Sequence, residues 1–239
     1  MQHRSIFRQQ WSTIFRRRST NPHKTLSVTD CQETECSTQN SATRIASKLR
    51  TFIERELWDA MFSVLTSEEC KSVDEDSMQF AESGDNVLHL ACKHHAPLEV
   101  VVGMMEQLPN AAAETNRQGQ YALHCAAQWG ACPEVIHLIY NAHHFALEHQ
   151  DNDDRTPLML ACKYYRTNYR YTKGEPTISQ AVAATIRMLA RSCPSVSILE
   201  DKEHLSSIEY ALYSGVDLGT IRCIQMASCR EWKRREGSL

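Results

Sequence analysis

A repeat of about 35 residues constrains the fold of this chain more strongly than any other feature of its sequence. Four aliphatic residues mark the repeat: Leu88, Leu123, Leu158 and Ile208. The first three are 35 residues apart, the fourth comes 50 residues after the third, and an alanine stands three residues beyond each. A second aliphatic series has spacings of 35, 50 and 35 residues: Val101, Ile136, Ile186 and Ile221. Two series in one register predict a supersecondary unit that recurs four times and stacks as a solenoid, with 15 extra residues inside the third unit.

Each unit predicts a polar turn followed by two antiparallel helices. The turns hold residues that adopt a positive φ more readily than most: Gly84, Gly119, Asp154 and His204. Two residues later stands a short polar side chain suited to cap the first helix, at Asn86, Thr156 and Ser206. In the second unit Tyr121 takes this place and cannot cap in that way. The second, more aliphatic helices are expected at Leu98–Leu108, Pro133–Ala142, Gln180–Arg191 and Leu218–Ala227.

The first helices carry a family resemblance. The stretches "NVLHLACK", "YALHCAAQWG" and "TPLMLACK" resemble the ankyrin Thr-Pro-Leu-His-x-Ala-Ala motif. The fourth stretch, "LSSIEYAL", lacks the proline and the histidine, as expected of a terminal unit that has water on one side. The resemblance covers residues 81–230 and implies an all-α solenoid of about four helix-turn-helix units. We place the units at 81–113, 114–147, 148–197 (with an insert at 164–179) and 198–230.

The segments outside the repeats have different compositions. Residues 1–43 are basic and then polar, and we expect them to be disordered because they offer little apolar surface to bury. Residues 44–80 predict one amphipathic helix around Trp58, which caps the solenoid, followed by an acidic link. Residues 231–239 are expected to form a tail.

The histidines and cysteines of the repeats are expected to serve the fold. The resemblance implies that His89 and His124 bond to backbone near the turns. Cys92, Cys125 and Cys162 stand at core positions, where a buried thiol behaves as a small hydrophobe; the alternative for them is a nucleophilic thiol. No Gly-rich phosphate loop, Gly-x-Ser-x-Gly, Cys-x-x-Cys or His-Glu-x-x-His occurs. We therefore expect a protein that is not an enzyme and that needs no cofactor or metal.

Composition narrows the class further. The formal charge is −3, so no strong overall field favours nucleic acid. No run of about 18 apolar residues is present, so we expect no membrane span. Ten cysteines in 239 residues could suggest a secreted, disulfide-bridged protein, but small secreted disulfide domains are usually shorter than about 80 residues. We expect reduced thiols and a monomer in the cytoplasm.

The resemblance implies that a protein partner meets the turn tips and the inner face of the first helices. The inner-face positions follow the small residues of the motif: Lys93, His94, Gln128, Trp129, Lys163, Tyr164 and Tyr213. The tips contribute Arg117, Gln118, Gln120, Asn152, Asp153 and Arg155. Trp, Tyr and Arg dominate interface hot spots, and we expect Trp129 to be the main anchor. The alternative is that Trp129 packs on its neighbours and fills space.

The insert at 164–179 holds four of the eight tyrosines, among them Tyr169 and Tyr171, with two arginines and a lysine. Insertions in repeats often map to the binding face, so we include these tyrosines in the site. Two alternatives are a longer helix pair in which the tyrosines pack together, and single-stranded nucleic acid on interleaved aromatics and cations. The second alternative is not favoured, because the host domain is not basic.

The basic arm allows three interpretations. Residues 1–29 contain no acid, and Ile6, Phe7, Trp11, Ile14 and Phe15 fall roughly on one helical face, as in a mitochondrial presequence. Alternatively, "RRRSTNP" resembles a basophilic kinase site at Ser19 that overlaps a phosphopeptide-binding motif at Thr20. The third interpretation is a solvated tail. The first would place an ankyrin-type binding protein inside the organelle.

Overall fold

The structure is a computed structural model that describes residues 41–67, 80, 82–165 and 178–237. Predictions for the arm at 1–40, for the acidic link at 68–79 and for most of the insert, including Tyr169 and Tyr171, lie outside the described residues. The described backbone is helical, as predicted. Its β-type pairing is limited, over these residues, to isolated bridges between Thr115 and Tyr121 and between Glu200 and Ser206.

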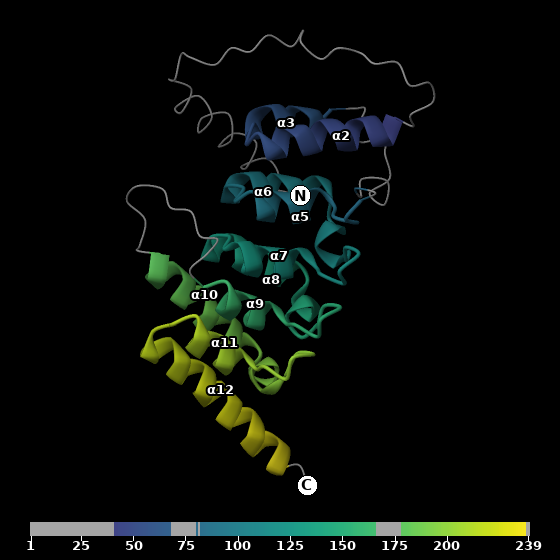
Figure 1. Cartoon of the computed structure of the whole chain (residues 1–239). Coiled ribbons are helices and arrows are strands. Elements are labelled where there is room, and N and C mark those ends of the chain that lie inside the picture. The colour runs from purple at the N-terminus through teal and green to yellow at the C-terminus, as the bar shows by residue number, and fades with distance from the viewer. Residues whose placement is uncertain (1–40, 68–79, 81, 166–177, 238–239) are drawn as a thin grey trace, which may run out of the picture. The chain divides into compact units, whose positions relative to one another are not determined.

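Four helix pairs form the repeats, and Figure 1 shows them following one another in sequence order. The first helices are short: α5 (Val87–Lys93), α7 (Ala122–Trp129), α9 (Pro157–Lys163) and α11 (Ser207–Tyr213). The second helices are longer: α6 (Leu98–Gln107), α8 (Pro133–Ala142), α10 (Ile178–Ser192) and α12 (Leu218–Glu236). Short 3₁₀ segments lead to the next turn: η2 (Ala111–Ala113), η3 (His144–Leu147) and η4 (Pro194–Ile198).

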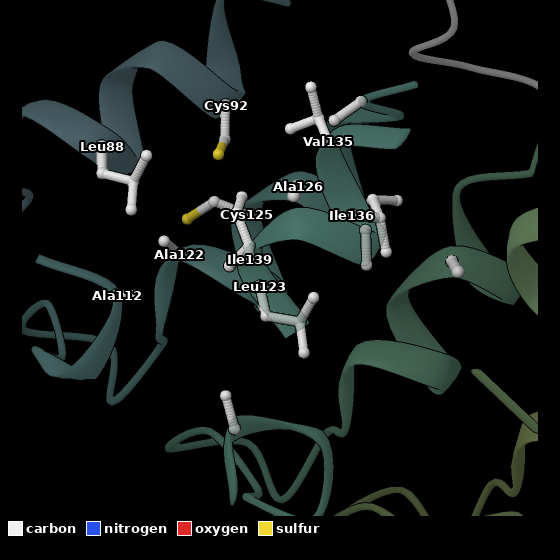
Figure 2. Packing of buried hydrophobic residues seen from close by; sticks show 14 of the residues in the cluster. Leu88, Cys92, Ala112, Ala122, Leu123, Cys125, Ala126, Val135, Ile136 and Ile139 are labelled. Atoms are coloured by element: carbon white, nitrogen blue, oxygen red, sulfur yellow. The ribbon is translucent and has the colours of Figure 1, made fainter. Parts of the chain in front are cut away.

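The helices form two layers with the core between them. Each first helix packs on the first helix of the next unit, and each second helix packs on the next second helix. The register residues Leu88, Leu123 and Leu158 are fully buried. Figure 2 shows Leu88 and Cys92 of α5 pointing toward Cys125 of α7, with Val135 and Ile136 on α8 behind that helix. Burial of these side chains at about 25 cal/mol per Å² is what holds neighbouring units together.

The expected single capping helix is two helices, α2 (Ser41–Glu54) and α3 (Trp58–Leu65). The break falls at Glu56, whose φ is +56°, in the left-handed region. α2 packs on α5 and α3 packs on α6, so the pair continues both layers of the stack. One straight helix could extend only one layer, which is why the chain turns here. The expected start at residue 44 also lies inside α2.

α12 extends into the segment that we expected to be a tail from residue 231. The helix runs to Glu236, and its last buried residues are Ser228 and Glu231. The Ser228 hydroxyl donates to the Ser197 carbonyl of η4 (3.3 Å). Glu231 is buried beneath the guanidinium groups of Arg234 and Arg235 (2.6 and 3.0 Å). The Ser228 bond joins α12 to the stack, and the Glu231 ion pairs hold the following turn within the helix, so the helix does not end with the repeat.

The predicted positive φ values are confirmed at all four turns. Gly84, Gly119, Asp154 and His204 have φ values of +68°, +71°, +61° and +61°. The side chains of Asn86 and Thr156 accept the backbone N–H three residues on, as helix N-caps do. At the fourth unit Glu209 instead accepts the N–H of Ser206 (2.6 Å). The turns therefore enter each first helix in one geometry.

Candidate functional site: the turn tips and the inner face

An Asn or Asp side chain organises each described turn from Asn116 onward. Its Oδ1 accepts the backbone N–H groups two and four residues ahead, which fixes the loop. In the second unit Asn116 accepts from Gln118 and Gln120, both at 3.0 Å. The equivalent residues are Asp151, with two bonds of 2.9 Å, and Asp201, with bonds of 2.9 and 3.0 Å. These side chains fix the conformation of the tips, which therefore hold the side chains of the tip residues in defined positions.

A polar pair joins each turn to the next. The residue just after the positive-φ position of one turn contacts the organising Asn or Asp of the following turn. The contact is made to the Nδ2 or Oδ2 atom, because Oδ1 is already bonded to the backbone of its own turn. Three such pairs link the four units: Asp85 with Asn116 (2.9 Å), Gln120 with Asp151 (2.8 Å) and Arg155 with Asp201 (3.5 Å). We call these three pairs the polar ladder. Its members are buried or nearly so, and each depends on a partner at least 31 residues away in sequence.

Backbone bonds between the tips run beside the polar ladder. The N–H of Arg117 donates to Ser83 (3.0 Å), that of Asn152 to Gln118 (2.9 Å) and that of Lys202 to Asp153 (3.2 Å). The backbone of the predicted tip residues Arg117 and Gln118 is thus part of the stack. Their side chains are exposed, and the Arg117 guanidinium reaches the Glu82 carbonyl (3.2 Å).

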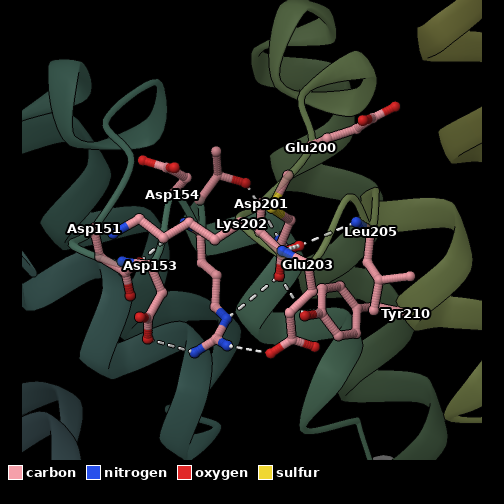
Figure 3. Close-up of polar contacts among 12 residues, drawn as sticks. Asp151, Asp153, Asp154, Glu200, Asp201, Lys202, Glu203, Leu205 and Tyr210 are labelled. Atoms are coloured by element: carbon pink, nitrogen blue, oxygen red, sulfur yellow. Dashed lines mark hydrogen bonds and ion pairs between the residues drawn. The ribbon is translucent and has the colours of Figure 1, made fainter.

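Arg155, predicted as a binding residue of the tips, lies in the ladder instead of projecting freely. Its guanidinium is surrounded by three carboxylates, those of Asp153 (2.8 Å), Glu203 (3.2 Å) and Asp201 (3.5 Å) (Figure 3). Tyr210 donates its hydroxyl to the same Asp201 carboxylate. The group joins the third unit to the fourth, so a partner would meet Arg155 only at the side that Asp153 and Glu203 leave open.

The motif histidines bond backbone, as the resemblance implied. The Nδ1 atom of His89 accepts the N–H of Asn86 (3.2 Å), and its Nε2 donates to the carbonyl of Gln120 (2.8 Å). His124 repeats this arrangement with Tyr121 (3.2 Å) and His149 (3.1 Å). Burial lowers the pKa of His89, and it lowers the pKa of His124 to about 4. Both rings are neutral cross-links between units at neutral pH.

The core thiols are inert. Cys92, Cys125 and Cys162 are buried, and burial raises the pKa of each, to about 12 for Cys125. A thiol is nucleophilic as the thiolate, which these residues do not form near neutral pH. Among the described residues no group of His, Cys, Asp and Glu side chains could hold a metal ion.

The predicted inner-face residues lie at the ends of α5, α7, α9 and α11, which are neighbours in one layer. We call this set the inner row: Lys93, His94, Gln128, Trp129, Lys163, Tyr164 and Tyr213. Most of the row is half-buried, and Trp129 packs partly against the core, whereas Tyr213 is 77% exposed. The row combines indole, phenol and ammonium groups on adjacent helices, a surface suited to an apolar anchor with acidic neighbours.

The two lysines of the inner row are already engaged within the chain. The Lys93 ammonium donates to the buried Asp85 carboxylate (2.7 Å), so the ladder and the row share this acid. The Lys163 ammonium lies 5.1 Å from the centre of the Tyr210 ring, a cation–π distance. Both remain partly accessible. The positive electrostatic potential of the inner row is therefore weaker than two unpaired lysines would produce.

The comparisons with known proteins agree with this architecture. Residues 88–171 match the family model for ankyrin repeats (3 copies). The crystal structure of EF0377, an ankyrin repeat protein, matches with a TM-score of 0.55 and 18% identity, over 74% of this chain and 78% of that chain. At that identity the match shows a shared fold. The chain therefore contains ankyrin repeats, which are generally protein–protein interaction modules. A search of curated proteins found no match.

Sequence reasoning missed the polar ladder, although a signal was present. Asn116, Asp151 and Asp201 keep the 35- and 50-residue spacing of the core leucines and stand three residues before each positive-φ position. That register could have identified the organising residues. Their cross-unit partners carry no such signal, because an aspartate, a glutamine and an arginine fill equivalent places.

Proposed function

We propose that the chain is a non-catalytic adaptor or scaffold that binds a protein partner on the inner row and the adjacent turn tips. The observation that carries the proposal is the inner row itself, where Trp129, Tyr164 and Tyr213 stand beside Lys93 and Lys163 on neighbouring helices of a rigid stack. Rigid aromatic side chains bind with little loss of conformational entropy, so a preorganised row favours tight contacts. The inert thiols and neutral histidines agree with a surface that binds without reacting.

The expected ligand is a segment with an apolar anchor and acidic neighbours. The anchor would cover Trp129, and Tyr213 at the open end of the row offers the largest accessible ring. The acids would meet the accessible sides of Lys93 and Lys163. Because Asp85 offsets Lys93, we expect aromatic contacts to supply more of the affinity than charge.

The test begins with affinity capture of partners by the full chain from its own cells, followed by calorimetric titration of the captured partner. Trp129→Ala should weaken binding by about 2 kcal/mol, roughly thirtyfold, because truncating a central indole removes most of what one residue contributes. Tyr213→Ala should weaken binding by a smaller amount. Phe145→Ala is the matched control, since this exposed aromatic lies on η3 and does not belong to the inner row.

Circular dichroism and urea unfolding establish that each variant is folded. If Trp129→Ala and Tyr213→Ala bind like the wild type while folded, the inner row is not the site. If Phe145→Ala is the variant that weakens binding, the site includes η3 and not the inner row.

The compartment of this binding module is a separate question, for which we propose the cytoplasm. The alternative is import into mitochondria, directed by the basic, acid-free residues 1–29. A fluorescent reporter fused to residues 1–43 separates the two. A diffuse signal from a product of full length supports the cytoplasm, whereas a mitochondrial signal with a shortened product supports import.

A further inference from the structure

Most of the large hydrophobic side chains that the described chain exposes lie in α11 and α12. The described chain has seven such side chains, and five of them fall within residues 212–232: Leu212, Tyr213, Leu218, Met226 and Trp232. Terminal units of a solenoid usually carry a polar outer face, which keeps the stack soluble. Contiguous exposed apolar side chains instead mark interaction sites. Tyr213 belongs to the inner row, so the other four need a separate explanation.

Leu212 shows how the last unit differs from the others. Its register equivalents in the first three units are Cys92, Ala127 and Cys162, which are small and no more than 1% exposed. Each of those lies on a helix that packs against the first helix of the next unit. Leu212 is larger than any of them and is 56% exposed. The fourth unit thus places a bulkier apolar group where an internal unit packs against its neighbour.

α12 extends this surface along its outward side. Residues at steps of four, four, three and four share one face of a helix, and here they are Leu218, Arg222, Met226, Cys229 and Lys233. We call this set the α12 face. Leu218 is 82% exposed and Met226 51% exposed, and Trp232, at 57%, borders the face next to Cys229. The opposite side of α12 is buried against the stack, through residues such as Ile221 and Ile224.

The α12 face is basic, although the chain as a whole carries a formal charge of −3. Arg222, Arg230 and Lys233 are exposed, and no described side chain forms an ion pair with them. The nearby acid Glu231 is buried and already bonded to Arg234 and Arg235, so it does not neutralise the face. The exposed acids of the described α12 and its cap lie at the two ends: Glu236 at the last turn, and the N-cap Asp217, whose carboxylate accepts the Thr220 N–H. Between these two ends, the apolar groups are flanked by cations that form no ion pair with a described side chain.

We infer that the α12 face is a second docking surface, and that it takes an acidic amphipathic helix of a partner protein. A helix with apolar residues at three- and four-residue steps can lie along Leu218, Met226 and Trp232, while Asp or Glu on its flanks meets Arg222, Arg230 and Lys233. A second copy of this chain fits less well. An isologous contact would place the basic face against itself.

The test uses the full chain and a displayed library of random 16-residue peptides. Peptides that bind the wild type are passed over a Met226→Ser/Trp232→Ser variant, and those that also bind the variant are discarded. One of the remaining peptides is then synthesised. We expect the survivors to be rich in Asp and Glu beside apolar residues at helical spacing. In fluorescence anisotropy titrations, Arg222→Glu and Met226→Ser should each lower the affinity of the chain for the synthesised peptide about tenfold or more. Lys48→Glu, an equal charge reversal at an exposed position of α2, is the matched control.

Three results overturn the inference. The first is a selection that leaves no peptide after depletion, or peptides without acids. The second is binding of the chain to vesicles of equal parts phosphatidylcholine and phosphatidylserine that Arg222→Glu abolishes, since the face would then be a lipid surface. The third is a dimer in sedimentation equilibrium that Met226→Ser dissociates. Trp129→Ala should bind the peptide like the wild type, so failure of the inner row leaves this test unaffected.

Discussion

The Nε atom of Arg155 lies 3.5 Å from Oδ2 of Asp201 and joins the turns of the third and fourth units, which an insert separates in the sequence. The pair is equivalent to Gln120 with Asp151 and to Asp85 with Asn116, which join the preceding units. Three different chemistries thus fill one geometric role. The consequence is that the spacing of the units is set at the tips by polar contacts and in the layers by apolar packing.

Replacing Arg155 should weaken the last junction of the stack. Arg155→Ala removes the cation while the Asp201 carboxylate stays buried, and an unpaired buried charge is destabilising. We expect urea unfolding to show a loss of about 2 kcal/mol, because Tyr210 and two backbone N–H groups still stabilise the carboxylate. Arg191→Ala, which removes an exposed arginine from the end of α10, should change stability by less than about 0.5 kcal/mol. Equal losses in the two variants would contradict the role of the ladder.

Acid should destabilise the stack through His124. Its folded pKa of about 4 lies below the ordinary value of 6.5, so the unfolded chain takes up the proton first as pH falls. Stability is therefore complete above about pH 6.5 and is lost as pH falls toward 4, by at most about 3 kcal/mol. His89 shifts in the same direction. Urea unfolding at several values between pH 7.5 and about 4.5 should show the free energy of unfolding decreasing as the pH falls.

A difference between variants isolates the His124 contribution. His124→Gln removes the titrating group and should flatten the pH dependence, even if the variant is less stable throughout. His137→Gln replaces an exposed histidine of α8 and should leave the slope as in the wild type. A slope unchanged by His124→Gln would mean that other groups carry the acid sensitivity.

The contact between Gly103 and Phe62 explains how the N-terminal helix pair docks. A Cβ atom built on Gly103 would lie 2.2 Å from Cε2 of Phe62, so α3 can approach α6 because this position has no side chain. Gly103→Ala should destabilise by about 1–3 kcal/mol through overpacking, although alanine favours a helix. In Gly103→Ala/Phe62→Ala the loss should be smaller than the sum of the single changes. Gly237→Ala, whose Cβ meets nothing closer than 3.4 Å, is the control for calorimetric melting; additive losses would argue against this contact.

The same contact shows where sequence reasoning reached its limit. The repeat, the turn residues and the burial of Leu88 or His124 follow from local pattern, because each unit repeats the same chemistry. The break at Glu56 has no local signal, since neither glycine nor proline stands at 55–57 and the apolar period continues through Leu57. The break becomes intelligible only when α3 is seen on α6. Similarly, the residues of the inner row could be chosen by register, but the carboxylates around Arg155 come partly from 46 or more residues away.

Asp85 links the polar ladder to the proposed binding surface. Its removal should lower the stability of the stack and raise the rate at which an acidic partner binds. Its carboxylate accepts from Lys93 (2.7 Å) and from Asn116 (2.9 Å). Burial acts to raise the pKa of Asp85, but these bonds outweigh it and the pKa is lowered, so the group is charged at neutral pH. Asp85→Asn keeps the shape and removes the charge. Stability should fall by about 1–2 kcal/mol because Lys93 loses its buried partner.

Binding of an acidic partner to the inner row should respond in the other direction. Without Asp85 the Lys93 charge is no longer offset, so the row attracts acids more strongly and the association rate should rise about threefold at low salt. The gain should shrink as salt approaches 1 M, where the screening length is about 3 Å. Stopped-flow mixing with the captured partner measures both rates, and Asp59→Asn on α3, an exposed acid far along the chain from the row, is the control. If Asp85→Asn leaves the association rate unchanged at low salt, or slows it, the partner does not place its acids near Lys93. The aromatic side chains of the inner row would then position the partner without help from the Lys93 charge.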